Sequence, residues 1–253
     1  KNFYLFEHFS SSTWMGMSLS KLTVAQIPRE TRTKMIQRGE LSQLALLPSF
    51  SGLSVFKDVV TTPDKTGIPV LDREVKSSGA SNYNNLAYIH ISEQYLHDAL
   101  YIIQHYPEVY FGALRKSFFR FFSPPTQLPV FFDNIIPILP VYKYYNATFY
   151  RPLVSCTVFL IVTSYGCLIL LKTLLGKSFD RPRTVFILFI WINIIYVTLV
   201  GNFLEIGENH RFRFMLDPLL MTLLGIVLDQ VFKRLGRRYQ NHQPSGTSYN
   251  LFT

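Results

Sequence analysis

The stretch LVSCTVFLIVTSYGCLILL, residues 153–171, contains nineteen consecutive residues without a charge. A second run, TVFILFIWINIIYVTLVGNFL at 184–204, contains twenty-one. A helix rises about 1.5 Å per residue, so about 20 apolar residues cross the roughly 30 Å hydrocarbon core of a bilayer. Both runs are therefore predicted to be transmembrane helices, at about 152–174 and 184–204.

A shorter uncharged run, PLLMTLLGIVL at 218–228, predicts a third transmembrane helix. It becomes long enough to cross the bilayer when it is extended to about 217–235. Asp217 followed by Pro218 is typical of a helix start. The aspartate oxygen can cap the first turn, and proline fits the first helical position.

Basic residues gather at one side of these three helices. They lie between the first two helices and after the third: Lys172, Lys177, Arg181, Arg183, Lys233, Arg234, Arg237 and Arg238. Cytoplasmic loops are enriched in Lys and Arg. The pattern predicts a cytoplasmic C-terminus and a lumenal or other extracytoplasmic position for the N-terminal half. Such a half must be translocated, either by a signal that is later removed or by an upstream membrane segment. We favour the second and expect the chain to be the C-terminal part of a longer polytopic protein.

The chain is accordingly divided into three parts. Residues 1–148 form an extracytoplasmic domain, soluble or interfacial, and residues 149–238 form the transmembrane domain. Residues 239–253 form a cytoplasmic tail that is expected to be disordered. The predicted fold class is an α-helical integral membrane protein with three transmembrane helices and an N-terminal extracytoplasmic α+β domain.

The outer domain mixes two kinds of pattern. Short apolar segments between turns, SGLSVF at 51–56 and GIPVL at 67–71, fit strands or loops. From Ser92, a candidate N-cap, apolar residues recur at helical spacing. Pro107 begins a second helix or kinks the first. That second segment is basic and rich in Phe, which fits either a helix on the membrane surface or a core helix with a solvated edge.

Prolines interrupt the apolar segment 128–150, so a continuous membrane helix is not expected there. Its aromatic residues at 142–150 suit the headgroup layer. Asn146 begins an Asn-Ala-Thr acceptor sequence, which matters only if the outside is an ER lumen.

The linker between the second and third helices is heavily charged for its position beside a bilayer. Its ionisable residues are Glu205, Glu208, His210, Arg211, Arg213 and Asp217. One interpretation is an interfacial loop whose charges neutralise each other, for instance Glu208 with Arg211 three residues later. The other is a phosphate site, because arginine offers a planar fork of donors and polar groups at this depth commonly serve a ligand.

Two stretches carry a resemblance to a known family. GENHRFRFMLDPLL, at 207–220, resembles the pattern that heads the last transmembrane helix in polytopic GT-C type glycosyltransferases. These enzymes are related to the dolichyl-phosphate-mannose protein mannosyltransferases and to bacterial aminoarabinose transferases. HYPEVYFGALRKSFFRFFSPP, at 105–125, resembles the segment that often precedes that region. Asn209 and His210 occupy two positions where the family pattern has one.

The resemblance implies a polyprenyl-phosphate-linked sugar donor, an inverting transfer and an extracytoplasmic active site. The implied lipid-phosphate site, with its supporting residues, comprises Glu208, His210, Arg211, Arg213, Glu205 and Asp217. In that family an Asp or Glu in the first external loop, after the first membrane helix, acts as catalytic base or metal-linked acid, so the catalytic residues stay unknown here. A divalent metal, where the chemistry uses one, is expected on that upstream part, and no metal site is assigned to this chain.

The sequence therefore predicts the C-terminal portion of a membrane glycosyltransferase that contributes lipid-phosphate and acceptor binding. Its expected partners are membrane lipid, a polyprenyl-phosphate sugar and other membrane subunits. Nucleic acid is not expected despite the net charge of +9, because the basic residues follow membrane topology or are scattered. Whether the chain is an enzyme stays open. The alternative is a non-catalytic membrane subunit whose outer domain binds partner proteins.

Overall fold

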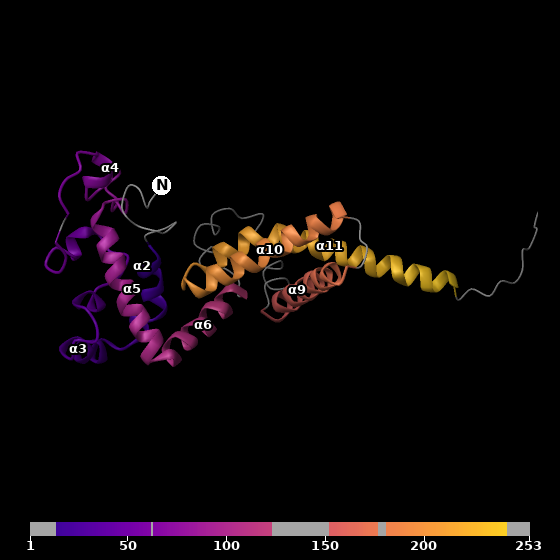
Figure 1. Ribbon diagram of the computed structural model, residues 1–253, viewed down its shortest axis with the longest axis horizontal. Coiled ribbons are helices and arrows are strands. Elements are labelled where there is room, and N and C mark those ends of the chain that lie inside the picture. The colour runs from indigo at the N-terminus through magenta and orange to yellow at the C-terminus, as the bar shows by residue number, and fades with distance from the viewer. Residues whose placement is uncertain (1–13, 62, 123–151, 177–180, 242–253) are drawn as a thin grey trace, which may run out of the picture. The chain divides into compact units, whose positions relative to one another are not determined.

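The computed structural model describes residues 14–61, 63–122, 152–176 and 181–241 (Figure 1). Its helices, in chain order, are α2 (Met15–Leu22), η1 (Val24–Gln26), α3 (Arg29–Gln37), η2 (Gln43–Leu46), η3 (Leu53–Val55), α4 (Pro69–Asp72), α5 (Ala87–His105), α6 (Pro107–Phe122), α9 (Pro152–Leu174), α10 (Arg181–Phe203) and α11 (Asn209–Asn241). The chain forms two compact units. The first comprises Lys1–Phe121 with Leu199–His210, and the second Phe122–Thr198 with Arg211–Thr253.

The predicted α+β character of the N-terminal domain is wrong. Within the described ranges the domain holds helices and a single isolated bridge between Val75 and Ser81, and no strand. The segment 51–56 contains η3, whose Leu53 and nearby Phe56 are buried three residues apart. The segment 67–71 runs into α4, which Pro69 begins. Short apolar runs fit a strand or a helical turn equally well by pattern alone, and packing decides between them.

Helix α5 is the central element of the first unit, with α2 alongside it (Figure 1). The two helices touch at Gly16, where an added Cβ would lie 1.8 Å from the carbonyl oxygen of Ser92. Only glycine therefore permits this approach. Ser92 is buried inside α5, which begins five residues earlier than the predicted N-cap, at Ala87.

Polar side chains of α5 hold the preceding loops in place. The hydroxyl of Tyr95 donates toward the carbonyl oxygens of Leu44 and Leu47, at 3.0 Å each. The Asp98 carboxylate accepts from the backbone N–H of Ser42 at 3.0 Å and from its hydroxyl at 2.6 Å. These bonds satisfy polar groups that burial against α5 would otherwise leave unpaired.

Helix α6 begins at Pro107, as one of the two sequence interpretations had it. Its buried residues Ala113, Leu114, Ser117 and Phe121 form one face, while Phe111 and Phe119 are exposed. The helix thus has a packed face and a second face that combines exposed phenylalanines with basic residues.

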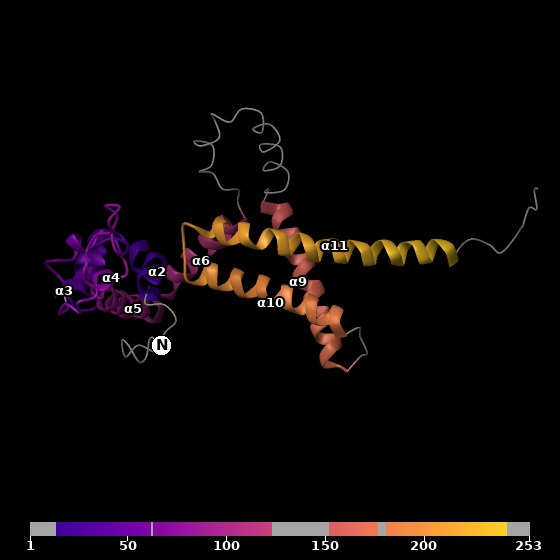
Figure 2. The ribbon, with the colours of Figure 1, turned by 90° about the horizontal axis from the view of Figure 1, so that it is seen from above.

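The second unit contains α9 and most of α10 and α11. Within the described residues, three helices are long and apolar enough to cross a membrane, as predicted: Val154–Leu174, Arg181–Phe203 and Asn209–Arg238. Figures 1 and 2 both show α10 and α11 running alongside each other. Buried residues repeat at helical spacing on both, Ile187, Ile190 and Ile194 on α10 and Leu216, Leu220 and Leu223 on α11. Gly166 of α9 lies against Trp191 of α10, where a Cβ would come within 2.1 Å of the indole.

The predicted start of the third membrane helix, at Asp217–Pro218, is wrong. Helix α11 begins at Asn209 and carries Pro218 inside it. The proline removes one backbone hydrogen bond, to the carbonyl of Phe214. Prolines are tolerated within transmembrane helices because neighbouring groups satisfy the freed backbone. The Asn146 acceptor sequence, the proline-interrupted segment 128–150 and the tail from 242 onward lie outside the described residues.

Candidate functional site

The linker between α10 and α11 is anchored by Asn209, a fully buried residue at the start of α11. Its Nδ2 donates to Ser117 Oγ on α6 at 2.7 Å. The same nitrogen lies 3.0 Å from the carbonyl oxygens of Gly201 and Glu205 and 3.2 Å from Asn202 Oδ1. One amide thus ties the end of α10, the linker and α6 together.

Ser117 completes this network from the side of α6. Its hydroxyl, fully buried, lies 3.0 Å from both Asn202 Oδ1 and the carbonyl oxygen of Glu205. Tyr110, two turns earlier on α6, donates its hydroxyl to the carbonyl oxygen of Phe203 at 2.9 Å. Because buried polar groups cost free energy unless they are bonded, these contacts fix the linker against α6.

The linker makes a tight turn before α11. Gly207 has a φ of +126°, a conformation that side chains rarely adopt. Its N–H donates to Asn209 Oδ1 at 3.0 Å, so Asn209 accepts from the turn and donates to its surroundings with the same amide. The turn leaves Glu208 exposed immediately before α11.

Glu205 is held by a cation from elsewhere in the first unit. Its carboxylate forms an ion pair and hydrogen bond with Lys21 of α2. The carboxylate also accepts from the N–H of Ile206 at 3.1 Å. Lys21 Nζ lies 5.3 Å from the centroid of the Phe50 ring as well. Through these contacts, Glu205 stabilises the linker.

In the second unit, Arg213 forms an ion pair with Asp217 one helical turn later on α11. Arg213 Nε donates to Asp217 Oδ1 at 2.7 Å, and the arginine side chain is only 5% exposed. Its guanidinium carbon lies 5.7 Å from the Phe122 ring centroid. A guanidinium stacked on an aromatic face and bonded to a carboxylate is held in one geometry.

The structure separates the six predicted site residues into different surroundings. Arg213 and Asp217 are brought together, and Glu205 is paired with Lys21 instead of with a member of the set. Glu208 and Arg211 are exposed, and His210 is half-buried. Residues two apart on a helix point to different sides. Arg211 and Arg213 therefore differ in role: one is accessible and the other is buried.

Sequence reasoning missed four residues that organise this region: Lys21, Ser117, Asn202 and Asn209. Only Asn202 carried a local signal, since it is a polar residue near the end of a strongly apolar run. The partnership of Lys21 with Glu205 spans 184 residues, and nothing in the local pattern of either residue indicates it.

The histidines at 90, 97 and 105 lie on α5. All three are exposed. His90 Nδ1 lies 3.3 Å from Glu93 Oε2, and His105 stacks on Tyr101 with ring centroids 4.2 Å apart. Across the described part of the chain, no group of three or more His, Cys, Asp or Glu side chains converges to hold a metal ion.

The first unit also has an open cavity of about 730 Å³. Among the residues around it are Asp58, His90 and Gln94, whose side chains can donate to or accept from a hydroxyl-rich ligand.

Comparison of the chain with protein-family models, with curated proteins and with solved structures gives no match.

Proposed function

We propose that this chain is the C-terminal portion of a membrane glycosyltransferase that uses a polyprenyl-phosphate-linked sugar donor. One observation carries the proposal. The two stretches that resemble GT-C type glycosyltransferases, 105–125 and 207–220, are bonded to each other through Ser117 and Asn209. Segments that are far apart in the chain and share a family resemblance are expected to form one architectural element, and this contact supports that view.

The proposed orientation rests on the basic residues at one end of each membrane helix. Lys172 lies near the end of α9, Arg181 and Arg183 begin α10, and Lys233 and Arg234 lie in the last turns of α11. By the positive-inside rule these ends face the cytoplasm. The linker from Leu204 to Glu208 then lies at the extracytoplasmic surface, the level at which a lipid phosphate sits.

Within this site, we assign the phosphate contact to Arg211. Arg211 is an exposed residue in the first turn of α11, where the helix dipole also favours an anion. Arg213 has a positioning role, because its ion pair with Asp217 and its place over Phe122 hold this part of α11. Glu208 and His210 flank the contact in the sequence and would orient the donor headgroup.

The proposal assigns donor binding, and not bond breaking, to these residues. The catalytic carboxylate would come from outside the described segments. The rival role, a non-catalytic subunit that binds partner proteins, predicts no response of the region to a lipid phosphate.

The experiment is to replace Arg211 by Ala in the full-length protein in membranes and to measure turnover against donor concentration. A charge-assisted hydrogen bond contributes about 1.5–3 kcal/mol, so the apparent donor affinity should fall about 10- to 100-fold. The matched control is Arg73→Ala, which removes an exposed arginine of the first unit far from the linker in sequence. Unchanged donor affinity and turnover in Arg211→Ala would contradict the assignment of the phosphate contact to Arg211.

A further inference from the structure

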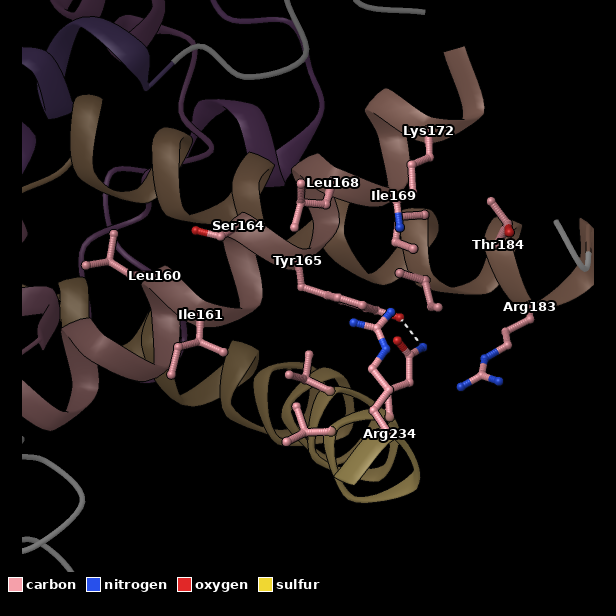
Figure 3. A pocket seen from close by; sticks show the side chains of 14 residues that line it. Leu160, Ile161, Ser164, Tyr165, Leu168, Ile169, Lys172, Arg183, Thr184 and Arg234 are labelled. Carbon is pink, nitrogen blue, oxygen red and sulfur yellow. Dashed lines mark hydrogen bonds between the residues drawn. The ribbon is translucent and has the colours of Figure 1, made fainter. Parts of the chain in front are cut away.

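A second hollow lies among the three membrane helices of the second unit, at the ends opposite the α10–α11 linker. Its volume is about 660 Å³, and residues of α9, α10 and α11 line it (Figure 3). Arg234, in its wall, is 23 residues after Arg211 on α11, which is about 34 Å along a helix. This cavity is therefore distinct from the proposed donor site.

The lining of the cavity has an apolar part and a basic part. Figure 3 shows Leu160 and Ile161 on one side of the cavity and the cations Lys172, Arg183 and Arg234 toward the other. Leu160 is twelve residues before Lys172 on the same helix, so the apolar wall extends about 18 Å from the basic end. Among the described residues that line the cavity there is no carboxylate.

A hydrogen-bonded pair of uncharged side chains crosses the cavity between α9 and α11. Gln230 Nε2 donates to the Tyr165 hydroxyl oxygen at 2.6 Å (Figure 3). This bond uses the oxygen of Tyr165 as an acceptor, so its O–H can still donate to a ligand in the cavity. The pair adds a positioned donor beside the three cations.

We propose that this cavity binds one anionic glycerophospholipid of the cytoplasmic leaflet. An acyl chain would lie along Leu160, Ile161 and Leu168, and the phosphate would contact Lys172, Arg183 and Arg234 with the Tyr165 hydroxyl. Charge complementarity supports an anion, and the length of apolar wall in the membrane-spanning segment supports a lipid over a free ion. The inference requires only the positive-inside orientation and is independent of the glycosyltransferase assignment.

Surface cations at a membrane boundary also attract anionic lipid without any cavity, and the test must separate the two. The cavity variant is Arg183→Gln with Arg234→Gln. The matched control is Arg181→Gln with Lys233→Gln, which removes the same charge from the same helix ends at residues outside the lining. The full chain is purified in detergent with phosphatidylglycerol or phosphatidylcholine, and the lipids retained per protein are counted by native mass spectrometry.

The wild type and the control are expected to retain phosphatidylglycerol in preference to phosphatidylcholine. The cavity variant should retain it about 30-fold more weakly, since each cation contributes about 1 kcal/mol to attraction of an anionic lipid. Equal losses in the two double variants would mean general surface attraction and would overturn the proposal. Displacement of the lipid by excess inorganic phosphate would identify an anion site without a lipid, and would also overturn it.

A second variant keeps the test decisive if the charge variant does not fold. The double variant Ile161→Trp with Leu168→Trp fills the cavity beside its apolar wall and leaves every charge in place. Both residues are exposed in the wild type. Loss of the retained phosphatidylglycerol from this variant supports the cavity. Undiminished retention contradicts it.

Discussion

Asn209 donates a hydrogen bond from Nδ2 to Ser117 Oγ over 2.7 Å, although 92 residues separate the two in the sequence. Both side chains are fully buried. The bond joins the start of α11 to the middle of α6, and it brings Asn202 and Glu205 into one network. The hydrogen-bond network, together with the ion pair between Glu205 and Lys21, fixes the geometry of the linker.

Replacing Asn209 by Ala is expected to destabilise the first unit. The change removes the Asn209 donor from the buried Ser117 oxygen and from the carbonyl oxygen of Gly201, at a cost of about 1–3 kcal/mol. Thermal unfolding of the full chain in detergent measures it. Asn84→Ala, at an exposed asparagine, is the control and should melt close to the wild type. Equal melting of Asn209→Ala and the wild type would contradict the role of the network.

Two glycines in the first unit should respond in opposite ways to replacement by Ala. A Cβ at Gly16 would lie 2.6 Å from the Leu96 nitrogen and closer still to Ser92, so Gly16→Ala forces α2 away from α5. We expect a loss of about 2 kcal/mol or more. Gly112 of α6 has open space around it, and Gly112→Ala should stabilise by about 0.5–1 kcal/mol. Melting temperatures that move in the same direction would contradict the close approach.

The stability of the first unit should depend on pH through Asp98. Burial raises the pKa of Asp98 above its ordinary 3.8, although hydrogen bonds from Ser42 oppose the shift. The folded protein therefore binds this proton more readily than the unfolded chain does. The resulting stabilisation is complete below the ordinary pKa and is lost as the pH rises through the raised value.

Wild type should consequently lose stability relative to Asp98→Asn as the pH rises from about 4 toward neutral. Unfolding of both proteins in detergent across that range measures the difference. If the stability difference between the wild type and Asp98→Asn stays constant with pH, the raised pKa of Asp98 is not its cause.

The sequence allowed the membrane part of the fold to be predicted better than the rest. Uncharged runs at 153–171 and 184–204 predict spanning helices because burying charge in hydrocarbon is costly, whatever the tertiary structure. The start of α11 was mistaken because Asp217–Pro218 satisfies a local rule for helix starts. The hydrogen bond from Asn209 to Ser117 and the close approach of Gly16 to α5 join residues that are far apart in the sequence. Local rules do not predict such contacts.

In the candidate site, too, local features could be predicted from the sequence and contacts between distant residues could not. The charged residues of the linker were evident, yet their partners were not. Glu205 pairs with Lys21 of α2. Arg213 is buried, pairs with Asp217 and lies over the Phe122 ring. Long-range pairing depends on how the helices pack, and a single sequence carries little record of that packing.

Two carboxylates on α11 provide a matched comparison of buried and exposed ion pairs. Asp217→Ala removes the carboxylate to which the buried Arg213 Nε donates, and we expect a loss of about 3–5 kcal/mol. Asp229→Ala removes the partner of Lys233, an exposed pair of the same spacing, and should cost less than about 1 kcal/mol. Thermal unfolding in detergent compares them. Similar losses for the two would show that Arg213 tolerates the change and that the pair does not position α11.

The most direct test of the central claim is photo-crosslinking with polyprenyl phosphate that carries a photoactivatable group beside its phosphate. The probe is added to the full-length protein in membranes, and the labelled peptides are identified by mass spectrometry. The account predicts label on residues 207–215, competed by unmodified polyprenyl phosphate and reduced in Arg211→Ala. Label confined to other segments, with this peptide unmodified, would contradict the claim that the head of α11 binds the lipid phosphate.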